Sequence, residues 1–513
     1  MNDSSSSRNS PVFETFLALC LAAAAGVTAV SQFYRYGSLL YYGDALAHLN
    51  IARRIVDSRT AGLDQIGTVW LPLPHLLMLP FAGNDYLWRT GLAGAIPAVF
   101  CLVAGAGFLF AAVRRAFGST AVAAAALGLL ILNPNLLYVG SIPMTEVVFF
   151  GAFFALLYFS VLFAENQSPW VIVAAGLAAL AGSLTRYEGW FVIPFFALYF
   201  LVAARRRRWR AAVIFGLIAS AGPLAWLAHN WWHYGDALEF YRGPWSAKAI
   251  YERALASGMQ RYPGDGEWLK AGRYFAAAAR LCAGWPLVAL GTAGVVAALW
   301  RRKYWLVGLL ALPPVFYVWS IHSGGTPIFV PHLWPHSYYN TRYGLAALPL
   351  LAVAGGCLTL LAPARRRAAA AAAIVVIGAV PWLVSPSPGS WICWKESEVN
   401  SEQRRAWTRE AAGYLRAHYR GGGIITSFGD LTGIFLEAGI PLRETLHSGN
   451  QPEWQASIAR PDLFLRQEWA VTISGDRVAT AILRARRDGP RYECVKIIAL
   501  KGAPVIEIYR RTR

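Results

Sequence analysis

The chain has 513 residues, of which 56% are hydrophobic and 15% are charged, whereas a soluble domain is about 25% charged. Its formal net charge of +19 comes from 47 Lys and Arg against 28 Asp and Glu, but the basic residues lie between long apolar runs, where they typically record membrane topology. The composition excludes an ordinary soluble enzyme, and we expect a membrane partner and no nucleic-acid partner.

Apolar stretches of about 20 residues, the length that spans a bilayer, recur through the first three quarters of the chain. The first, near 12–33, is longer than the roughly 7 to 15 residues of a signal-peptide core. The others lie near 86–113, 119–138, 145–164, 170–185, 188–204, 211–231, 284–300, 304–321, 343–362 and 368–384. We therefore predict a polytopic α-helical membrane protein with about eleven spans.

Short basic clusters orient these spans. They lie at 114–115, 205–208, 301–303 and 365–367, and each falls on the same side as the N-terminus. The positive-inside rule makes that side cytoplasmic. We predict a plasma (inner) membrane location, with long segments facing outward at 34–85, 139–144, 232–283, 322–342 and in the tail.

The polar tail after residue 384 alternates helix-like and strand-like segments. Helices are predicted at 401–418 and 431–438, and strands at 423–427, 492–500 and 505–510. We expect two domains, a multi-span membrane domain at 1–384 and a soluble extracytoplasmic α/β domain at 385–513. Cys393 and Cys494 both fall in this oxidising compartment and are candidates for a disulfide.

The first outward segment opens with GDALAHLNIARRIV, an amphipathic helical pattern in which Asp44 and His48 share one face. Asp44 follows the first span directly, where a carboxylate is placed to accept a proton from a hydroxyl group. His48 is a candidate substrate-binding residue on the same face. The alternative for Asp44 is a structural role as the N-cap of the helix.

The second outward turn brings Glu146, just after Pro143, to the start of the next span. A carboxylate there is stabilised by the positive N-terminal end of the helix dipole, and this structural role alone would explain Glu146. It is also a candidate second catalytic carboxylate. Together, Asp44 and Glu146 are candidate ligands of a divalent cation, although the sequence indicates no dedicated metal site and no other cofactor.

The string TRYEGW places Arg186, Tyr187 and Glu188 between two apolar runs. A charge at the centre of a span costs about 2.5 kcal/mol or more, so these side chains need partners. Arg186 is a candidate ligand of a lipid phosphate, with Tyr187 and Glu188 beside the substrate. The alternative is an internal ion pair of Arg186 with Glu188 or Glu146.

The outward loop before the span at 343–362 contains PHSYYNTRYG, with His336, Tyr339 and Arg342. Arg342 is a second phosphate candidate, and His336 and Tyr339 are candidate substrate contacts. An arginine at the mouth of a span also snorkels to the interface for structural reasons alone.

These features resemble the GT-C superfamily of glycosyltransferases, which take a sugar from a polyprenyl-phosphate or dolichyl-phosphate carrier and include protein O-mannosyltransferases and the lipid A aminoarabinose transferase. The resemblance rests on the Asp after the first span, the long first outward loop, the acid at the second outward turn, the outward tail, and the strings GDALAHL and TRYEGW. In the mannosyltransferases Glu follows the first-loop Asp, whereas here Ala45 follows Asp44. The resemblance implies inverting transfer, with Asp44 as the base, Glu146 as a second acid, and Arg186 and Arg342 as phosphate ligands.

We therefore expect an enzyme that moves a sugar from a polyprenyl-phosphate donor to a hydroxyl acceptor on a glycan, lipid or protein at the outer face of the membrane. The alternative is a transporter or flippase of envelope lipids or glycans, which also carries charged residues in its spans. A catalytically silent membrane subunit that binds envelope glycans is a third reading.

Overall fold

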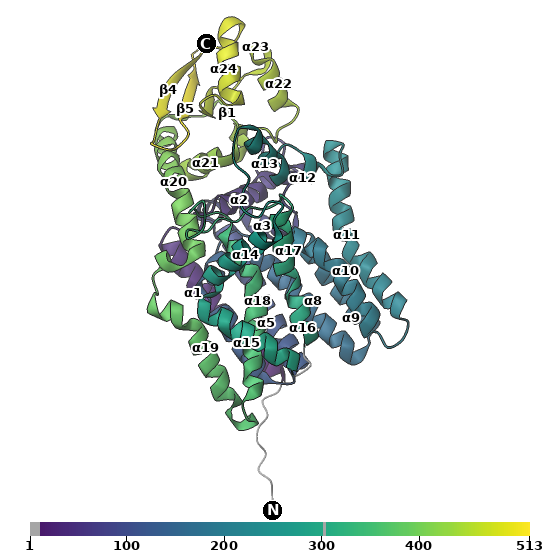
Figure 1. Ribbon diagram of the computed structural model, residues 1–513. Coiled ribbons are helices and arrows are strands. Elements are labelled where there is room, and N and C mark those ends of the chain that lie inside the picture. The colour runs from purple at the N-terminus through teal and green to yellow at the C-terminus, as the bar shows by residue number, and fades with distance from the viewer. Residues whose placement is uncertain (1–10, 301–303, 513) are drawn as a thin grey trace, which may run out of the picture. The chain divides into compact units, whose positions relative to one another are not determined.

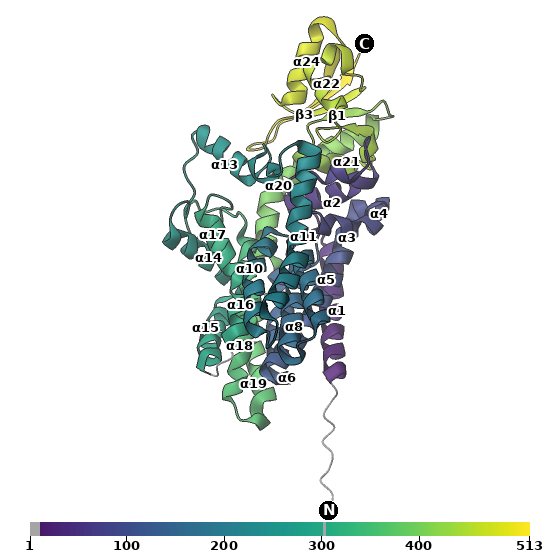
Figure 2. The same ribbon diagram turned by 90° about the vertical axis from the view of Figure 1, so that its right-hand side faces the viewer.

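The computed structural model describes residues 11–300 and 304–512, so the polar segment 1–10 and the basic cluster at 301–303 lie outside the described residues. The chain forms two compact units (Figures 1 and 2). We call Met1–Phe33, Ala98–Ser141 and Thr145–Glu396 the membrane unit, and Tyr34–Pro97, Ile142–Met144 and Ser397–Arg513 the sheet unit. Both units are therefore assembled from segments that are distant in the sequence.

The membrane unit is built of helices. Its helices are α1 (Pro11–Arg35), α5 (Leu92–Phe117), α6 (Thr120–Ile131), α7 (Pro134–Val139), α8 (Glu146–Asn166), α9 (Pro169–Ser183), α10 (Tyr187–Ala203), α11 (Arg208–Tyr234), α12 (Glu239–Arg242), α13 (Ala247–Ala256), α14 (Trp268–Ala283), α15 (Trp285–Trp300), α16 (Tyr304–Leu310), α17 (Leu312–His322), α18 (Leu348–Cys357) and α19 (Arg367–Val384), with the 3-10 segments η2 (Thr341–Ala347), η3 (Leu358–Leu361) and η4 (Ala364–Arg366).

Within the described residues, 7 helical stretches are long and apolar enough to cross a membrane, or 8 if the bent pair α14 and α15 counts as one span. They are Pro11–Arg35, Leu92–Phe117, Glu146–Asn166, Arg208–Tyr234, Trp305–His322, Thr341–Leu361 and Ala364–Val384. The apolar helices α6, α9 and α10 have 12, 15 and 17 residues, short for a bilayer core that needs about 20. The chain is thus a multi-pass helical membrane protein, and the count of about eleven spans stays a prediction.

Close contact between α9 and α10 fixes the turn that joins them. A Cβ atom on Gly189 would lie 2.4 Å from the carbonyl carbon and oxygen of Gly182, so only glycine fits at residue 189. The chain reverses between these glycines through Thr185 and Arg186, and Arg186 is the N-cap residue of α10. The sequence therefore places Arg186 on a tight, well-packed helix boundary.

The sheet unit contains a five-stranded mixed sheet of order β2-β1-β3-β5-β4. β1 is parallel to β2 and β3, whereas β5 is antiparallel to β3 and β4. The strands are β1 (Ile424–Thr426), β2 (Thr445–Leu446), β3 (Trp469–Ile473), β4 (Tyr492–Ile498) and β5 (Ile506–Arg511). The helical segments are α2 (Gly43–Val56), η1 (Leu63–Ile66), α3 (Leu73–Ala82), α4 (Asp85–Thr90), α20 (Ile392–His418), η6 (Gly429–Leu431), α21 (Thr432–Ala438), η7 (Leu442–Glu444), α22 (Glu453–Ala459), α23 (Pro461–Phe464) and α24 (Arg477–Asp488). The 3-10 segment η5 (Pro388–Ser390), just before α20, belongs to the membrane unit.

Alternating residues of the strands enter two apolar cores, one on each face of the sheet. Ile424 belongs to the core that also contains Leu46 of α2, Trp88 of α4 and Trp407 of α20. Ile425 belongs to the core on α22 and α24. Residues 34–97 therefore pack in one core with the tail, and α2, which contains Asp44, packs against α20 and α21. The boundary predicted between residues 384 and 385 stays a prediction, while the division of the two units falls inside α20, between Glu396 and Ser397.

The disulfide proposed between Cys393 and Cys494 is not present, because both are free cysteines. Cys393 is buried in the membrane unit with its Sγ 3.9 Å from Sγ of Cys282. Cys494 lies in β4, where its Sγ is 3.7 Å from the carbonyl oxygen of Lys496. The prediction was wrong because both cysteines lie in the tail sequence but belong to different units.

Candidate active site

Asp44 lies in the first turn of α2, and the N-cap residue of this helix is Tyr42. The reading of Asp44 as the N-cap is therefore wrong, although a carboxylate in the first turn still favours the helix dipole. Arg404 of α20 interacts electrostatically with Asp44, and burial is the largest influence on Arg404, lowering the pKa of its guanidinium. A partly buried cation thus faces the candidate base.

His48 is buried one turn after Asp44. Its Nδ1 lies 2.9 Å from Nε2 of His75, and its ring centroid lies 4.6 Å from that of Trp70. Burial, together with the positive charges of its neighbours, holds the pKa of His75 well below its usual range. The two imidazoles form a packed polar pair inside the sheet unit, and the substrate contact expected of His48 stays a prediction.

Arg186 is surrounded by polar partners in the membrane unit. Its Nε lies 2.8 Å from Oε1 of Glu188, and its Nη1 lies 3.2 Å from Oε1 of Glu146. Its guanidinium also donates to the hydroxyls of Thr145 and Tyr317, and Tyr317 in turn donates to Glu188. The internal ion pairs that the sequence left open as an alternative are therefore formed, with both of the acids named.

Arg342, in η2, reaches the same carboxylate from another segment. Its Nε lies 3.2 Å from Oε1 of Glu146, and its Nη1 lies 3.5 Å from Oε1 of Glu396. Glu396 accepts from the backbone and the hydroxyl of Thr341, and burial raises the pKa of its carboxyl. Arg342 is 5% exposed, so it is a buried member of this cluster and the snorkelling alternative is wrong.

Glu146 lies between the two arginines, and one of its oxygens bridges them. Both distances are 3.2 Å, longer than the roughly 2.7 to 2.9 Å of a strong charge-assisted bond. Its other oxygen, Oε2, is buried without a hydrogen-bond partner in the part of the chain that the structure describes. An unsatisfied buried carboxylate oxygen is costly, so Glu146 is the least well held of the acids in this cluster.

The cluster surrounds a cavity of about 10 Å³, room for roughly one water molecule. Glu146, Arg186, Glu188, Tyr317, Arg342 and Tyr343 line it together with apolar residues. Both guanidinium groups also lie over the ring of Tyr343, at 5.3 Å for Arg186 and 4.8 Å for Arg342. An anion larger than water enters only if a side chain, such as the loosely held Glu146, moves aside.

Three other candidates have contacts outside this cluster. Tyr187 stacks on Phe240 at 5.3 Å between ring centroids. His336 is exposed, with its Nδ1 3.1 Å from the carbonyl oxygen of Pro331, and Tyr339 pairs through its backbone with Phe329. Their contact with substrate stays a prediction. Within residues 11–300 and 304–512, no group of three or more His, Cys, Asp or Glu side chains is arranged to hold a metal ion.

The sequence alone missed Thr145, Tyr317, Thr341, Tyr343 and Glu396. One signal was available, because the tripeptide TRY occurs both at 185–187 and at 341–343, and each copy supplies one arginine of the cluster. Glu396 gave no such signal, since it lies in the polar tail where a buried carboxylate is not expected.

Comparison with known proteins finds a family model that matches part of the chain. Residues 88–233 match the family model for dolichyl-phosphate-mannose-protein mannosyltransferase. The resemblance to the GT-C superfamily is confirmed. The matched segment contains Glu146, Arg186, Tyr187 and Glu188, and it ends well before Arg342 and Glu396. No curated protein matches the chain by sequence.

Among solved structures, the chain is similar to the apo crystal structure of ArnT from Cupriavidus metallidurans. The alignment has a TM-score of 0.51 and 14% sequence identity, and it covers 94% of this chain and 98% of that chain. At this identity the likeness concerns the fold. It extends over nearly the whole chain, so residues of both units take part in it.

Proposed function

We propose that the protein is a GT-C glycosyltransferase that moves a sugar from a polyprenyl-phosphate carrier to a hydroxyl acceptor. The acceptor belongs to a lipid, glycan or protein at the outer face of the plasma membrane. In this proposal the N-terminus is cytoplasmic and the tail extracytoplasmic, and the sugar is a hexose or a pentose. The family match over 88–233 and the whole-chain likeness to ArnT support the class of reaction.

The observation that carries the proposal is the bridge that Glu146 makes between Arg186 and Arg342. One carboxylate oxygen lies 3.2 Å from a nitrogen of each guanidinium group, in the place that a phosphate oxygen takes in an arginine clamp. Its long distances and its unpartnered Oε2 make it displaceable. In our proposal the donor phosphate replaces Glu146 between the two arginines, while Glu188 and Tyr317 keep Arg186 in place.

The reaction then follows from general acid–base and electrostatic catalysis. Asp44 accepts the proton of the acceptor hydroxyl while the oxygen of that hydroxyl attacks the anomeric carbon of the sugar. The bond between that carbon and the phosphate oxygen breaks, and its electron pair leaves with the lipid phosphate. Arg186 and Arg342 stabilise the negative charge that grows there. Attack opposite to the leaving group inverts the anomeric centre.

The test is release of polyprenyl phosphate by the full-length protein in lipid discs, supplied with a panel of polyprenyl-phosphate sugars and a cell-envelope lipid extract. We expect Asp44→Asn to lower release by roughly 10²- to 10⁴-fold, the usual contribution of a general base. Asp64→Asn is the matched control, because Asp64 lies in the same outward segment and its carboxylate accepts from Gln65 Nε2. Full activity in Asp44→Asn would show that another group takes the proton.

One observation favours the transporter alternative. Helices α14 and α15 form an apolar pair that is bent by 111° at a short break, and Gly284 at the break has φ 80°, a conformation that suits glycine. Transporters bind their substrates at such discontinuous helices. A flippase would move a fluorescent polyprenyl-phosphate sugar across proteoliposomes without releasing polyprenyl phosphate, so the same release assay separates the two functions.

A further inference from the structure

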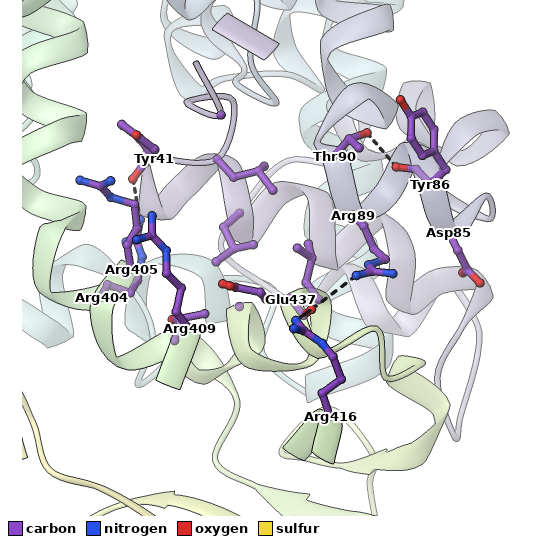
Figure 3. Close-up of a pocket in the computed structure, with 16 residues that line it drawn as sticks. Tyr41, Asp85, Tyr86, Arg89, Thr90, Arg404, Arg405, Arg409, Arg416 and Glu437 are labelled. Atoms are coloured by element: carbon purple, nitrogen blue, oxygen red, sulfur yellow. Dashed lines mark hydrogen bonds between the residues drawn. The ribbon is translucent and has the colours of Figure 1, made fainter. Parts of the chain in front are cut away.

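The sheet unit contains a second, larger cavity that the proposed reaction does not use. Its volume is about 590 Å³, within the roughly 300 to 1,000 Å³ of small-molecule sites. Figure 3 shows its lining, which comes from the segment before α2 and from α2, α4, α20 and α21. All of these residues belong to the sheet unit.

Five arginines line this cavity. Helix α20 contributes Arg404, Arg405, Arg409 and Arg416, and α4 contributes Arg89. Arg405, Arg409 and Arg416 lie four and then seven residues apart, so they share one face of α20. In Figure 3, Arg404 and Arg405 lie on the Tyr41 side of the cavity, whereas Arg89 and Arg416 both reach the backbone carbonyl of Glu437.

The hydrogen bonds of these arginines go mostly to uncharged groups. Arg404 donates to the carbonyl oxygen of Tyr41, Arg405 donates to the hydroxyl of Ser401, and Arg89 and Arg416 donate to the carbonyl oxygen of Glu437. None of these bonds neutralises a guanidinium charge. The arginines therefore keep charge available for an anion that enters the cavity.

The acids of the cavity do not balance this charge. Asp85 is already paired with Arg53, at 2.6 Å between Oδ1 and Nη2. Glu437, the other carboxylate in the lining, interacts with Arg409 and Arg416, while burial raises the pKa of its carboxyl. Arg404 also interacts with Asp44 and Asp430. The other four guanidinium groups of the lining face two carboxylates, and a concave site with this excess of positive charge concentrates anions.

One wall of the cavity is apolar. Leu40, Leu46 and Leu436 belong to it, and the guanidinium carbon of Arg405 lies 4.1 Å from the ring centroid of Tyr41. A small inorganic anion would leave this wall uncovered. A body with carbon surface that carries several anionic groups would cover the wall and the arginines together.

We propose that this cavity binds an anionic ligand that carries at least two phosphate groups on a partly apolar body. One phosphate accepts hydrogen bonds from the guanidinium groups of Arg405 and Arg409, and another accepts them from Arg89 and Arg416. The apolar body packs against the leucines of the lining. The ligand is either the headgroup of a membrane lipid or a water-soluble phosphorylated molecule. This binding does not depend on the transferase activity proposed above.

Two probes separate these sources, both applied to the full-length protein in phosphatidylcholine discs. Cardiolipin, which carries two phosphates on lipid chains, is added to the discs and retained adducts are measured by native mass spectrometry. ADP, which carries two phosphates on an organic body, is titrated from solution by calorimetry. We expect Arg405→Gln/Arg409→Gln to weaken the binding of whichever probe binds by about tenfold or more, since bonds to charged groups contribute roughly 1.5 to 3 kcal/mol each.

The matched control is Arg420→Gln/Arg466→Gln, which removes the same charge from exposed arginines of the sheet unit outside the cavity. Arg405→Lys/Arg409→Lys keeps the charge and loses the paired hydrogen bonds, so it should bind with intermediate affinity if folding is intact. Retention of cardiolipin alone assigns a lipid headgroup, and binding of ADP assigns a soluble ligand. The proposal is overturned if neither probe binds the wild type, or if the cavity and control variants bind equally.

Discussion

Two groups of arginines, one in each unit of this protein, lie in opposite surroundings. In the membrane unit, Arg186 is 13% exposed and Arg342 is 5% exposed, and the carboxylates of Glu146, Glu188 and Glu396 surround them. In the sheet unit, Arg409 and Arg416 are exposed side chains on the rim of a cavity. A buried charge needs a counterion at all times, whereas water solvates a partly exposed charge when no ligand is bound. The same residue type is therefore bound to internal partners in the cluster around Glu146 and available to an external partner at the cavity of the sheet unit.

The largest effect expected from this difference is on stability. Arg186→Met should lower the free energy of unfolding by about 3 to 5 kcal/mol, because it leaves Glu188 buried without a counterion and leaves Glu146 with Arg342 alone. Arg409→Met, on the cavity rim, should change it by about 0.5 kcal/mol or less. Thermal unfolding followed by tryptophan fluorescence measures both. Equal losses in the two variants would contradict the contrast drawn between the units.

A second variant sharpens the role of Glu146. If the donor phosphate displaces this carboxylate, Glu146→Gln should bind polyprenyl phosphate about tenfold more tightly, because a neutral amide competes less for Arg186 and Arg342. Glu188→Gln is the control, since Glu188 holds Arg186 at 2.8 Å and its loss should not improve binding. Native mass spectrometry of the protein in discs compares the affinities of the two variants for polyprenyl phosphate. Weaker binding in Glu146→Gln would mean that Glu146 positions the arginines for the phosphate.

The sheet unit should also respond to pH. Burial holds the pKa of His75 and of His447 well below 6.5, so the unfolded chain binds protons there that the folded chain does not. The stability that these neutral imidazoles contribute is fully present above about pH 6.5 and is lost as the pH falls below it, toward the lowered folded values. Melting temperatures between about pH 7.5 and 5.5 should fall, and His447→Gln should flatten the slope. An unchanged slope in that variant would exclude His447 as a source.

The smallest effect concerns the cysteines. Cys393→Ser places a hydroxyl in the buried pair with Cys282 and should cost about 1 kcal/mol, whereas Cys494→Ser, half-buried in β4, should cost about 0.5 kcal/mol or less. Thermal unfolding of the two single variants measures both changes in the free energy of unfolding. Non-reducing peptide mapping should recover no peptide that links Cys393 to Cys494, and recovery of that linked peptide would contradict the free thiols of the structure.

Much of the local structure follows from sequence patterns. The helix expected after the first span is α2, and the strands expected at 423–427, 492–500 and 505–510 are β1, β4 and β5. The short β2 and the largely apolar β3 gave no alternating pattern and were missed. A strand that is buried on both faces reads as a plain apolar run, so periodicity does not mark it.

The candidate site shows the same limit. The sequence singled out Asp44, Glu146, Arg186, Glu188 and Arg342, because a charge next to an apolar run demands an explanation whatever the fold. It did not show that Glu146 bridges both arginines or that Glu396 closes the cluster. Arg342 is 196 residues from Glu146, and no local pattern encodes a contact at that separation.

By itself, the sequence determined the membrane class of the protein, the amphipathic helix of Asp44 and the positions of charges that need partners. These properties depend on hydrophobicity and on periodicity within one segment. Only the tertiary structure decided which charges meet, that residues 34–97 share a core with the tail, and that arginines of α4 and α20 line one cavity. Such pairings arise from the packing of whole elements, where the free energy depends on neighbours that the chain brings together only when it folds.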